Sequence, residues 1–125
     1  MDRPTFARWL QAYGSAWERK DVQAFAALFA EDARYYWTPF QQPKLGPEGI
    51  ADAVAGAFAR QREIRFGYEV LAVDARRGLA RWWCGLVRQG TGRSIRLEGI
   101  LSMVDDDTGR CVEFREWWHA DPADG

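Results

Sequence analysis

The second half of the sequence consists of four segments with β-strand character, joined by very short turns. The segments span about residues 66–74, 79–89, 94–104 and 111–119, and DARRG, GTGR and DDDTG stand between them. Each connecting sequence contains the Gly or Asp residues that tight turns need. Because connections this short cannot cross over a sheet, they predict that consecutive strands pair in antiparallel fashion.

The first half of the sequence has the apolar spacing of amphipathic helices. In a first helix, predicted from residue 5 to about residue 19, the apolar stripe consists of Phe6, Trp9, Leu10, Tyr13 and Trp17. Asp21 is the predicted N-cap of a second helix, since apolar residues recur every three or four positions after it. Pro47 favours the first turn of a third helix, which opens at Gly46 and extends to about Arg62. Between these two helices, ARYYWTP predicts a short strand and FQQPKLG a loop.

Three helices followed by a run of antiparallel strands define an α+β fold. We expect one domain over residues 1–125, because a chain of 125 residues has the ordinary size of one domain. The three N-terminal helices should pack on one face of a strongly curved, mostly antiparallel sheet. The result is a cone-shaped barrel, and a pocket remains where the helices do not fill its open end.

Composition narrows the classes of partner. Seven Trp, seven Phe and four Tyr supply more flat, bulky surface than a core of this size needs, which favours a cavity wall or a subunit interface. The net charge is −1 and neither sign forms a long run, so we expect no nucleic acid partner and no anionic membrane partner.

The N-terminal segment and the cysteines indicate the compartment. MDRPTFARWLQAYG lacks the apolar centre of a secretory signal, and no apolar run has the length of a membrane-spanning helix, so we expect a cytoplasmic protein. Cys84 and Cys111 fit no metal-ligand spacing, and in a reducing compartment we expect free thiols. DDDTG lacks the ligand spacing of a calcium loop. The sequence therefore implies no cofactor and no metal.

Three motifs carry a resemblance to a known family. They are ALFAEDA before the first strand, GPEGI at the start of the third helix, and GRCVEFREWW near the C-terminus. With these motifs the sequence resembles the SnoaL-like polyketide cyclase branch of the nuclear transport factor 2-like superfamily, over nearly its whole length. The resemblance implies a cone-shaped α+β barrel, a hydrophobic cavity for a small apolar or amphipathic molecule, and commonly a homodimer through the outer sheet face. Members include isomerases, cyclases and epoxide hydrolases, so the resemblance constrains fold more than function.

The resemblance also suggests a function for Tyr13. In the steroid isomerases of this superfamily, a tyrosine at the matching place donates a hydrogen bond to the substrate oxyanion; the alternative is a core tyrosine with a satisfied hydroxyl. Their general-base aspartate would fall at Trp37 or Thr38, and their second oxyanion acid near Ile100 or Leu101. Neither carboxyl group is present, so the steroid isomerase constellation is not expected.

The segment EFREWWH, from Glu113 to His119, combines two tryptophans and two carboxylates with the single histidine of the chain. Alternation along a strand separates two sets: Phe114, Glu116 and Trp118 on one face, and Arg115, Trp117 and His119 on the other. We predict that the first set lines a pocket, with Glu116 as a catalytic acid or base. The second set should meet a partner subunit.

In the strand LARWWCGLV, the same alternation places Trp82 inward and Trp83 outward. Trp83 and Trp117 then both lie on the outer face of the sheet. Because two large indole rings are costly to leave in water, we expect a homodimer whose contact contains them.

The third of the four strands has two faces of nearly equal apolar character, so its orientation stays open. If the face that carries Glu98 points inward, Glu98 joins Glu116 as a second catalytic carboxyl. Desolvation and like charge would then hold the two pKa values apart, as in a general acid–base site. The alternative is a structural ion pair with Arg62, Arg81 or Arg96.

The expected substrate-binding residues are Trp17, Asp32, Tyr35, Trp37, Phe58, Trp82, Phe114 and Trp118. Of these, Asp32 has an alternative interpretation, because Asp is also a routine turn former.

Three classes of function fit these residues. The leading hypothesis is a cofactor-independent lyase, isomerase or cyclase that uses Glu116 as acid or base and Tyr13 as hydrogen-bond donor. The second is an epoxide hydrolase that uses Glu98, Glu116 and an inward arginine. The third is a non-catalytic module that binds an apolar ligand or assembles with partners. A paired carboxylate with a depressed pKa would favour the module, and an unpaired one would favour catalysis.

Overall fold

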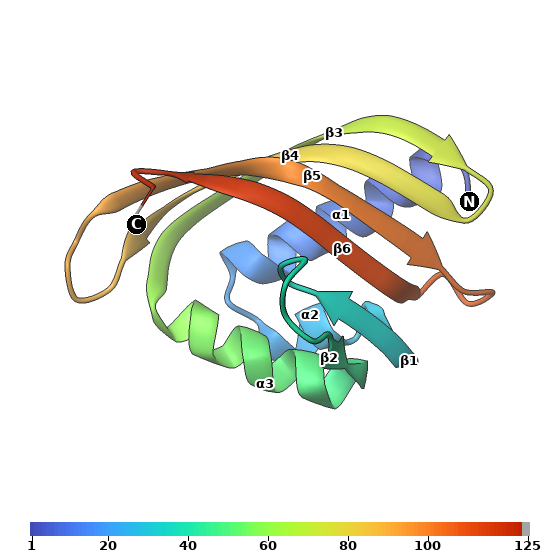
Figure 1. Cartoon of the computed structure of the whole chain (residues 1–125), viewed down its shortest axis with the longest axis horizontal. Helices are drawn as coiled ribbons and strands as arrows, with labels where there is room; N and C mark the ends of the chain where they lie inside the picture. Colours follow the sequence, from blue (N-terminus) through green and yellow to red (C-terminus); the bar gives the residue numbers. More distant parts are fainter. Residues whose placement is uncertain (124–125) are drawn as a thin grey trace.

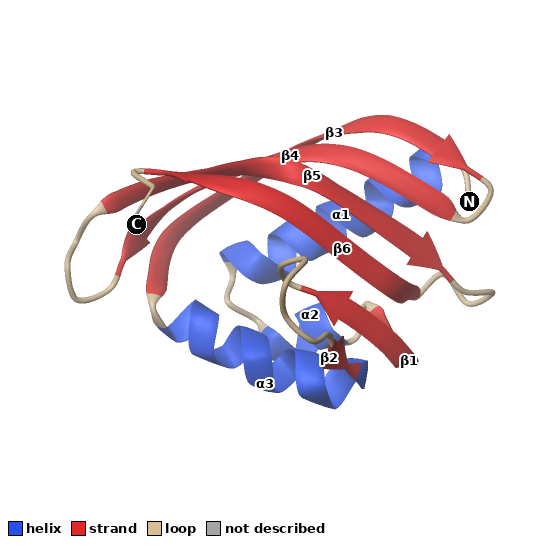
Figure 2. Ribbon diagram, in the orientation of Figure 1, coloured by secondary structure: helices blue, strands red, loops and turns tan. Residues whose placement is uncertain are grey.

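The computed structural model describes residues 1–123 and confirms the α+β architecture, with helices packed on one side of a curved sheet (Figure 1). Its elements are α1 (Arg3–Glu18), α2 (Val22–Ala26), β1 (Phe29–Tyr36), β2 (Lys44–Leu45), α3 (Gly46–Ala59), β3 (Gln61–Asp74), β4 (Arg77–Arg88), β5 (Ser94–Asp105) and β6 (Cys111–Asp121). Within the described residues, the strands form one sheet in the order β2-β1-β6-β5-β4-β3. Neighbouring strands run antiparallel, except that β1 and β6 run parallel. The helices lie on the concave side of this sheet (Figure 2).

Short polar side chains cap the first two helices. Asp2 accepts a hydrogen bond from Thr5 N at 2.9 Å at the start of α1, and Asp21 accepts one from Ala24 N at 3.0 Å at the start of α2. Each bond satisfies a backbone N–H that a helix leaves unpaired in its first turn. Pro47 lies in the first turn of α3, so Asp21 and Pro47 mark helix starts as predicted.

The strand β1 is longer than predicted, because it begins at Phe29 rather than at Ala33. Its pairing with β6 accounts for the difference: Phe29 lies opposite Cys111, and Cys111 N donates to Leu28 O at 2.9 Å. A pairing between segments so far apart in sequence leaves no signal in local spacing. The predicted loop after β1 also contains the short strand β2, which pairs with β1.

The strand β3 begins at Gln61, directly after α3, rather than near Phe66 as predicted, and α3 ends correspondingly earlier than Arg62. The pairing of β3 with β4 shifts its register after Arg62, where Glu63 adopts a φ of 54°. Such a bulge bends a strand and increases its twist. The bend wraps the first part of β3 around the helices (Figure 1).

Apolar side chains fill most of the space between the sheet and the helices. The fully buried ones include Phe6, Leu10, Phe25, Phe29, Leu101 and Phe114. On β5, Leu101 and Met103 face this core, so Glu98 and Ile100 lie on the outer face. This decides the strand orientation that the sequence leaves open.

Cys84 and Cys111 are both buried and free. In residues 1–123, the His, Cys, Asp and Glu side chains form no group of three or more that could hold a metal ion. None of the described helices is long and apolar enough to cross a membrane.

Candidate functional site

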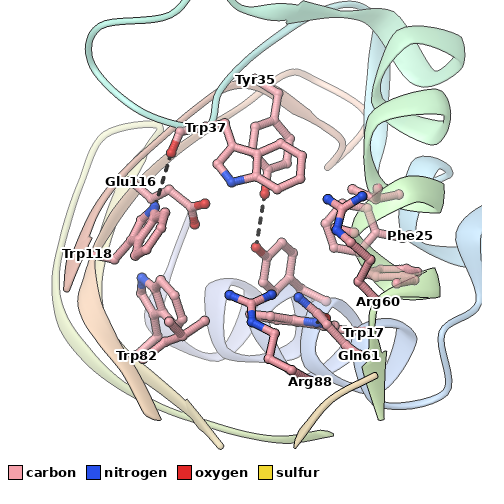
Figure 3. A pocket seen from close by; sticks show the side chains of 15 residues that line it. Trp17, Phe25, Tyr35, Trp37, Arg60, Gln61, Trp82, Arg88, Glu116 and Trp118 are labelled. Carbon is pink, nitrogen blue, oxygen red and sulfur yellow. Dashed lines mark hydrogen bonds between the residues drawn. The ribbon is translucent and has the colours of Figure 1, made fainter. Parts of the chain in front are cut away.

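A cavity of about 210 Å³ lies between the sheet and the C-terminal halves of α1 and α3 (Figure 3). Its wall is mainly aromatic. The predicted substrate-binding residues that line it are Trp17, Tyr35, Trp37, Phe58, Trp82 and Trp118. Both Tyr13 and Glu116 line it as well, so strand alternation and helical spacing identify most of the wall.

Glu116 projects from β6 into this cavity and is only 6% exposed (Figure 3). It lies opposite Leu101 on β5, which in turn lies opposite Ala80 on β4, so its neighbours along the inner face are apolar. Within residues 1–123, its carboxyl group has neither a hydrogen bond nor an ion pair. Burial raises the pKa of Glu116 to about 8, because apolar surroundings favour the protonated form.

The hydroxyl groups of Tyr13 and Tyr35 share a hydrogen bond of 3.2 Å at the cavity wall (Figure 3). Phe114 supports both rings, with centroids 5.4 Å from that of Tyr13 and 4.7 Å from that of Tyr35. Burial raises the pKa of both tyrosines well above the usual value, and the Glu116 carboxyl adds to both shifts, so both hydroxyls stay protonated. The hydrogen bond between the two hydroxyl groups uses one of their two protons. The other proton can therefore be donated to a ligand.

Indole N–H groups fix two of the tryptophan rings in the wall. Trp17 Nε1 donates to Gln61 Oε1 at 2.8 Å, and Trp118 Nε1 donates to the Trp37 carbonyl at 3.3 Å. Trp82 Nε1, in contrast, is buried without an acceptor in the described part of the chain. Two rings are therefore held in place by polar bonds, whereas the third keeps an unsatisfied donor.

Three predicted site residues do not line the cavity. Asp32 is exposed on β1, and Phe114 is fully buried as a support for the tyrosine pair. Glu98 lies on the outer face, with its side chain 62% exposed and an ion pair of 3.2 Å to Arg81. Glu98 therefore does not join Glu116, because Leu101 and Met103 take the inner face of β5, and the alternative ion pair with Arg81 is present.

Sequence reasoning missed three polar residues at the rim of the cavity: Arg60, Gln61 and Arg88. They come together because Gln61 pairs with Arg88 across β3 and β4, and Gln89 N donates to Arg60 O at 2.9 Å. The apolar spacing predicts a helix through about Arg62, and so it gives no sign that a strand begins earlier.

The predicted interface residues lie on the convex face of the sheet. Trp83 and Trp117 are 37% and 46% exposed, and His119 is exposed as well. Arg115 lies over the ring of Tyr36, at 3.8 Å from its centroid. These positions leave the side chains accessible to a second subunit, and the homodimer stays a prediction.

Solved structures with this fold cover almost the whole chain. A candidate isomerase from Bacillus subtilis aligns with a TM-score of 0.81 and 20% identity over 95% of this chain and 90% of its own. The epoxide hydrolase/cyclase-like enzyme SalBIII has a role in pyran ring formation in the polyether salinomycin. It aligns with a TM-score of 0.81 and 12% identity over 94% of this chain and 92% of its own. A computationally designed 17-OHP binder aligns with a TM-score of 0.76 and 16% identity over 91% of this chain and 95% of its own. At these identities the likeness shows the fold alone.

Among curated proteins, none matches the chain by sequence. The sequence pattern of the family described as SnoaL-like domain matches residues 10–115, from within α1 into β6. This range contains Tyr13 and Tyr35, and Glu116 follows directly after it. Because the match covers most of the sequence, the chain belongs to the SnoaL-like domain family.

Proposed function

We propose that this protein is a cofactor-independent enzyme that isomerises or cyclises a small carbonyl compound, with Glu116 as its acid–base group. The observation that carries the proposal is the isolation of Glu116, a carboxyl group buried in an aromatic cavity without a counter-ion among the described residues. Burying an ionisable group without a partner costs stability, and such groups cluster at catalytic sites. The unpaired carboxyl therefore favours catalysis over a structural ion pair.

A carboxyl group with a pKa of about 8 exists in both protonation states near neutral pH. In its ionised form, Glu116 takes a proton from a carbon next to the substrate carbonyl, and the electron pair of that C–H bond moves toward the carbonyl oxygen. The pair of Tyr13 and Tyr35 donates a hydrogen bond to the resulting enolate oxygen. Where a β,γ double bond of the substrate is conjugated with this enolate, Glu116 then returns the proton to the γ-carbon, which moves the double bond to the α,β position and restores the carbonyl group.

The cavity volume of about 210 Å³ limits the size of the substrate. An apolar protein cavity of about 150 Å³ holds benzene. A compound of one or two rings therefore fits, with its flat faces against the indole rings of Trp17 and Trp82.

Two other functions would need different features of the cavity. Epoxide hydrolysis would use a second carboxyl group in the cavity, and Glu98 lies on the outer face instead. A non-catalytic module would use the same cavity for binding, as the designed 17-OHP binder with this fold illustrates, but it would not depend on the ionisation of Glu116.

The test uses a β,γ-unsaturated cyclohexenone, whose conversion into the conjugated ketone is followed by ultraviolet absorbance. We expect the parent protein to accelerate the conversion, and Glu116→Gln to lose at least about 10²-fold of the rate. Tyr13→Phe should also lose about 10²-fold, because it removes a donor to the enolate oxygen. Glu98→Gln is the matched control, since it changes a carboxyl group outside the cavity and should keep the parent rate.

Exchange of the α-hydrogens of the ketone with solvent deuterium, followed by nuclear magnetic resonance, measures the first step separately. Equal exchange with the parent and with Glu116→Gln would contradict the acid–base assignment. If the ketone quenches tryptophan fluorescence but neither exchanges nor converts, the protein is a binding module.

A further inference from the structure

The rim of the cavity presents hydrogen-bond donors across from Glu116. Figure 3 shows Arg60, Gln61 and Arg88 on the side of the cavity away from that carboxyl group. Arg60 directly follows α3 and Arg88 ends β4, and the pairing of Gln61 with Arg88 joins the two segments. Two guanidinium groups and one amide therefore gather at one place.

Gln61 contributes an amide N–H donor that has no partner among the described residues. Its side chain is buried, at 7% exposure, and its Oε1 accepts a hydrogen bond from Trp17 Nε1 at 2.8 Å. That bond fixes the amide plane, and its Nε2 group finds no acceptor among residues 1–123. Because Gln61 lines the cavity, its amide can donate a hydrogen bond to a ligand or to water.

The charges of the cavity wall are separated. Glu116 is the one acidic side chain among the described lining residues, whereas Arg60 and Arg88 are basic. The pKa of Glu116 is raised by burial, with no lowering by an arginine, so neither guanidinium acts as its counter-ion. While Glu116 is protonated, Arg60 and Arg88 are the charged groups among the described lining residues, and a guanidinium group attracts anions.

We propose that the substrate of this cavity is an amphipathic anion, a small ring compound whose carboxylate is held by Arg60, Gln61 and Arg88. The inference rests on the proposed function, because it names the class of substrate for the same cavity. Guanidinium and amide N–H groups match the oxygens of a carboxylate, and such charge-assisted hydrogen bonds are about twice as strong as neutral ones. With its carboxylate at the rim, the ring of the ligand lies against the indoles and extends toward Glu116.

The test compares two probes of the same shape, cyclohexanecarboxylate and its neutral primary amide, titrated calorimetrically up to about 10 mM. We expect the anion to bind at least about tenfold more tightly than the amide, and Arg60→Gln to remove most of that preference. Arg62→Gln is the matched control. It removes the same charge two residues away, where the Arg62 guanidinium bonds to Gln89 at 3.2 Å and to Glu63 at 3.3 Å outside the cavity lining.

Equal affinity for the two probes, failure of the anion to bind, or an equal loss in Arg62→Gln would each overturn the inference. Ketone conversion by the parent and by Glu116→Gln separates this result from the proposed function. An anion preference together with conversion that does not depend on Glu116 rejects the proposed function alone. Glu116-dependent conversion without an anion preference rejects the inference alone.

Discussion

Glu116 couples the stability of the fold to pH, because it ionises at different pH values in the folded and unfolded chain. Its ordinary pKa of 4.5 applies to the unfolded chain, and burial raises the folded value to about 8. Between these values the folded protein keeps a proton that the unfolded chain releases. The contribution to stability is therefore complete below the unfolded pKa and is lost as pH rises toward the folded pKa, with a full difference on the order of 4 to 5 kcal/mol.

We expect the free energy of unfolding of the parent, measured with urea between about pH 5 and pH 8, to decrease across this window. Glu116→Gln removes the ionisable group, so its stability should depend less on pH and exceed that of the parent at the alkaline end. Glu98→Gln changes an exposed carboxyl and should keep the parent's slope. An unchanged slope in Glu116→Gln would assign the pH dependence to other groups.

The ionisation that lowers stability is also the one that creates the catalytic base. The fraction of Glu116 in the carboxylate form is about a tenth at pH 7 and about half at pH 8. The proposed proton abstraction should therefore become faster over the range in which the fold becomes less stable. This opposition is typical of a group that is retained for function rather than for stability.

Among the strands, Gly99 permits the close approach of β5 and β6 beside two tryptophans of the inner face. It lies on β5 between Trp82 on β4 and Trp118 on β6. A Cβ atom at Gly99 would lie 2.1 Å from the Trp117 carbonyl oxygen and 2.8 Å from the Trp118 Cα atom. Because both atoms belong to the backbone of β6, no side-chain rotation relieves the contact.

We expect Gly99→Ala to destabilise the protein by about 1–3 kcal/mol and to displace β6 near Trp118 and Glu116. Gly85→Ala is the matched control on β4, since a Cβ atom there meets nothing within 4 Å and should leave stability unchanged or raise it by about 0.5 kcal/mol. Urea unfolding and near-ultraviolet circular dichroism of the tryptophans measure the two effects. Equal stability of the two variants would mean that β6 adapts without cost.

Local patterns predict the faces of these elements better than their limits. Alternation along EFREWWH separates Glu116 from Trp117 correctly, because the two-residue period of a strand is a local property. The early starts of β1 at Phe29 and of β3 at Gln61 depend on pairing with distant strands, so local spacing does not reveal them. The rim of the cavity was missed for this reason, since Gln61 meets Arg88 through that pairing.

The orientation of β5 depends on packing rather than on pattern. Both of its faces are nearly equally apolar in sequence, so hydrophobicity does not choose between them. The concave side receives Leu101 and Met103, which are almost completely buried, and Glu98 pairs with Arg81 on the other side. Choosing between these two orientations requires the shape of the core, which a single strand does not encode.

At the scale of the whole molecule, the convex face of the sheet carries large apolar side chains from three adjacent strands. Two rows in register cross it, Arg81 with Ile100 and Trp117, and Trp83 with Glu98 and His119. The exposed fraction is 37% for Ile100, 37% for Trp83 and 46% for Trp117. Exposed aromatic side chains interspersed with an Arg81–Glu98 ion pair are compatible with a protein–protein contact, where aromatic residues and Arg are enriched, and this favours the predicted homodimer.

We expect sedimentation to give about twice the chain mass of 14.3 kDa. Trp117→Lys places a charge inside the contact and should weaken the dimer by at least about tenfold. The matched control is Phe40→Lys, which makes the same change at a 97% exposed residue in the segment between β1 and β2. A parent protein that is monomeric at micromolar concentration, or a dimer that Phe40→Lys weakens equally, would contradict the prediction. Because Trp117 and Glu116 point to opposite faces of β6, a monomeric Trp117→Lys protein that still converts the ketone would mean that one subunit contains the complete site.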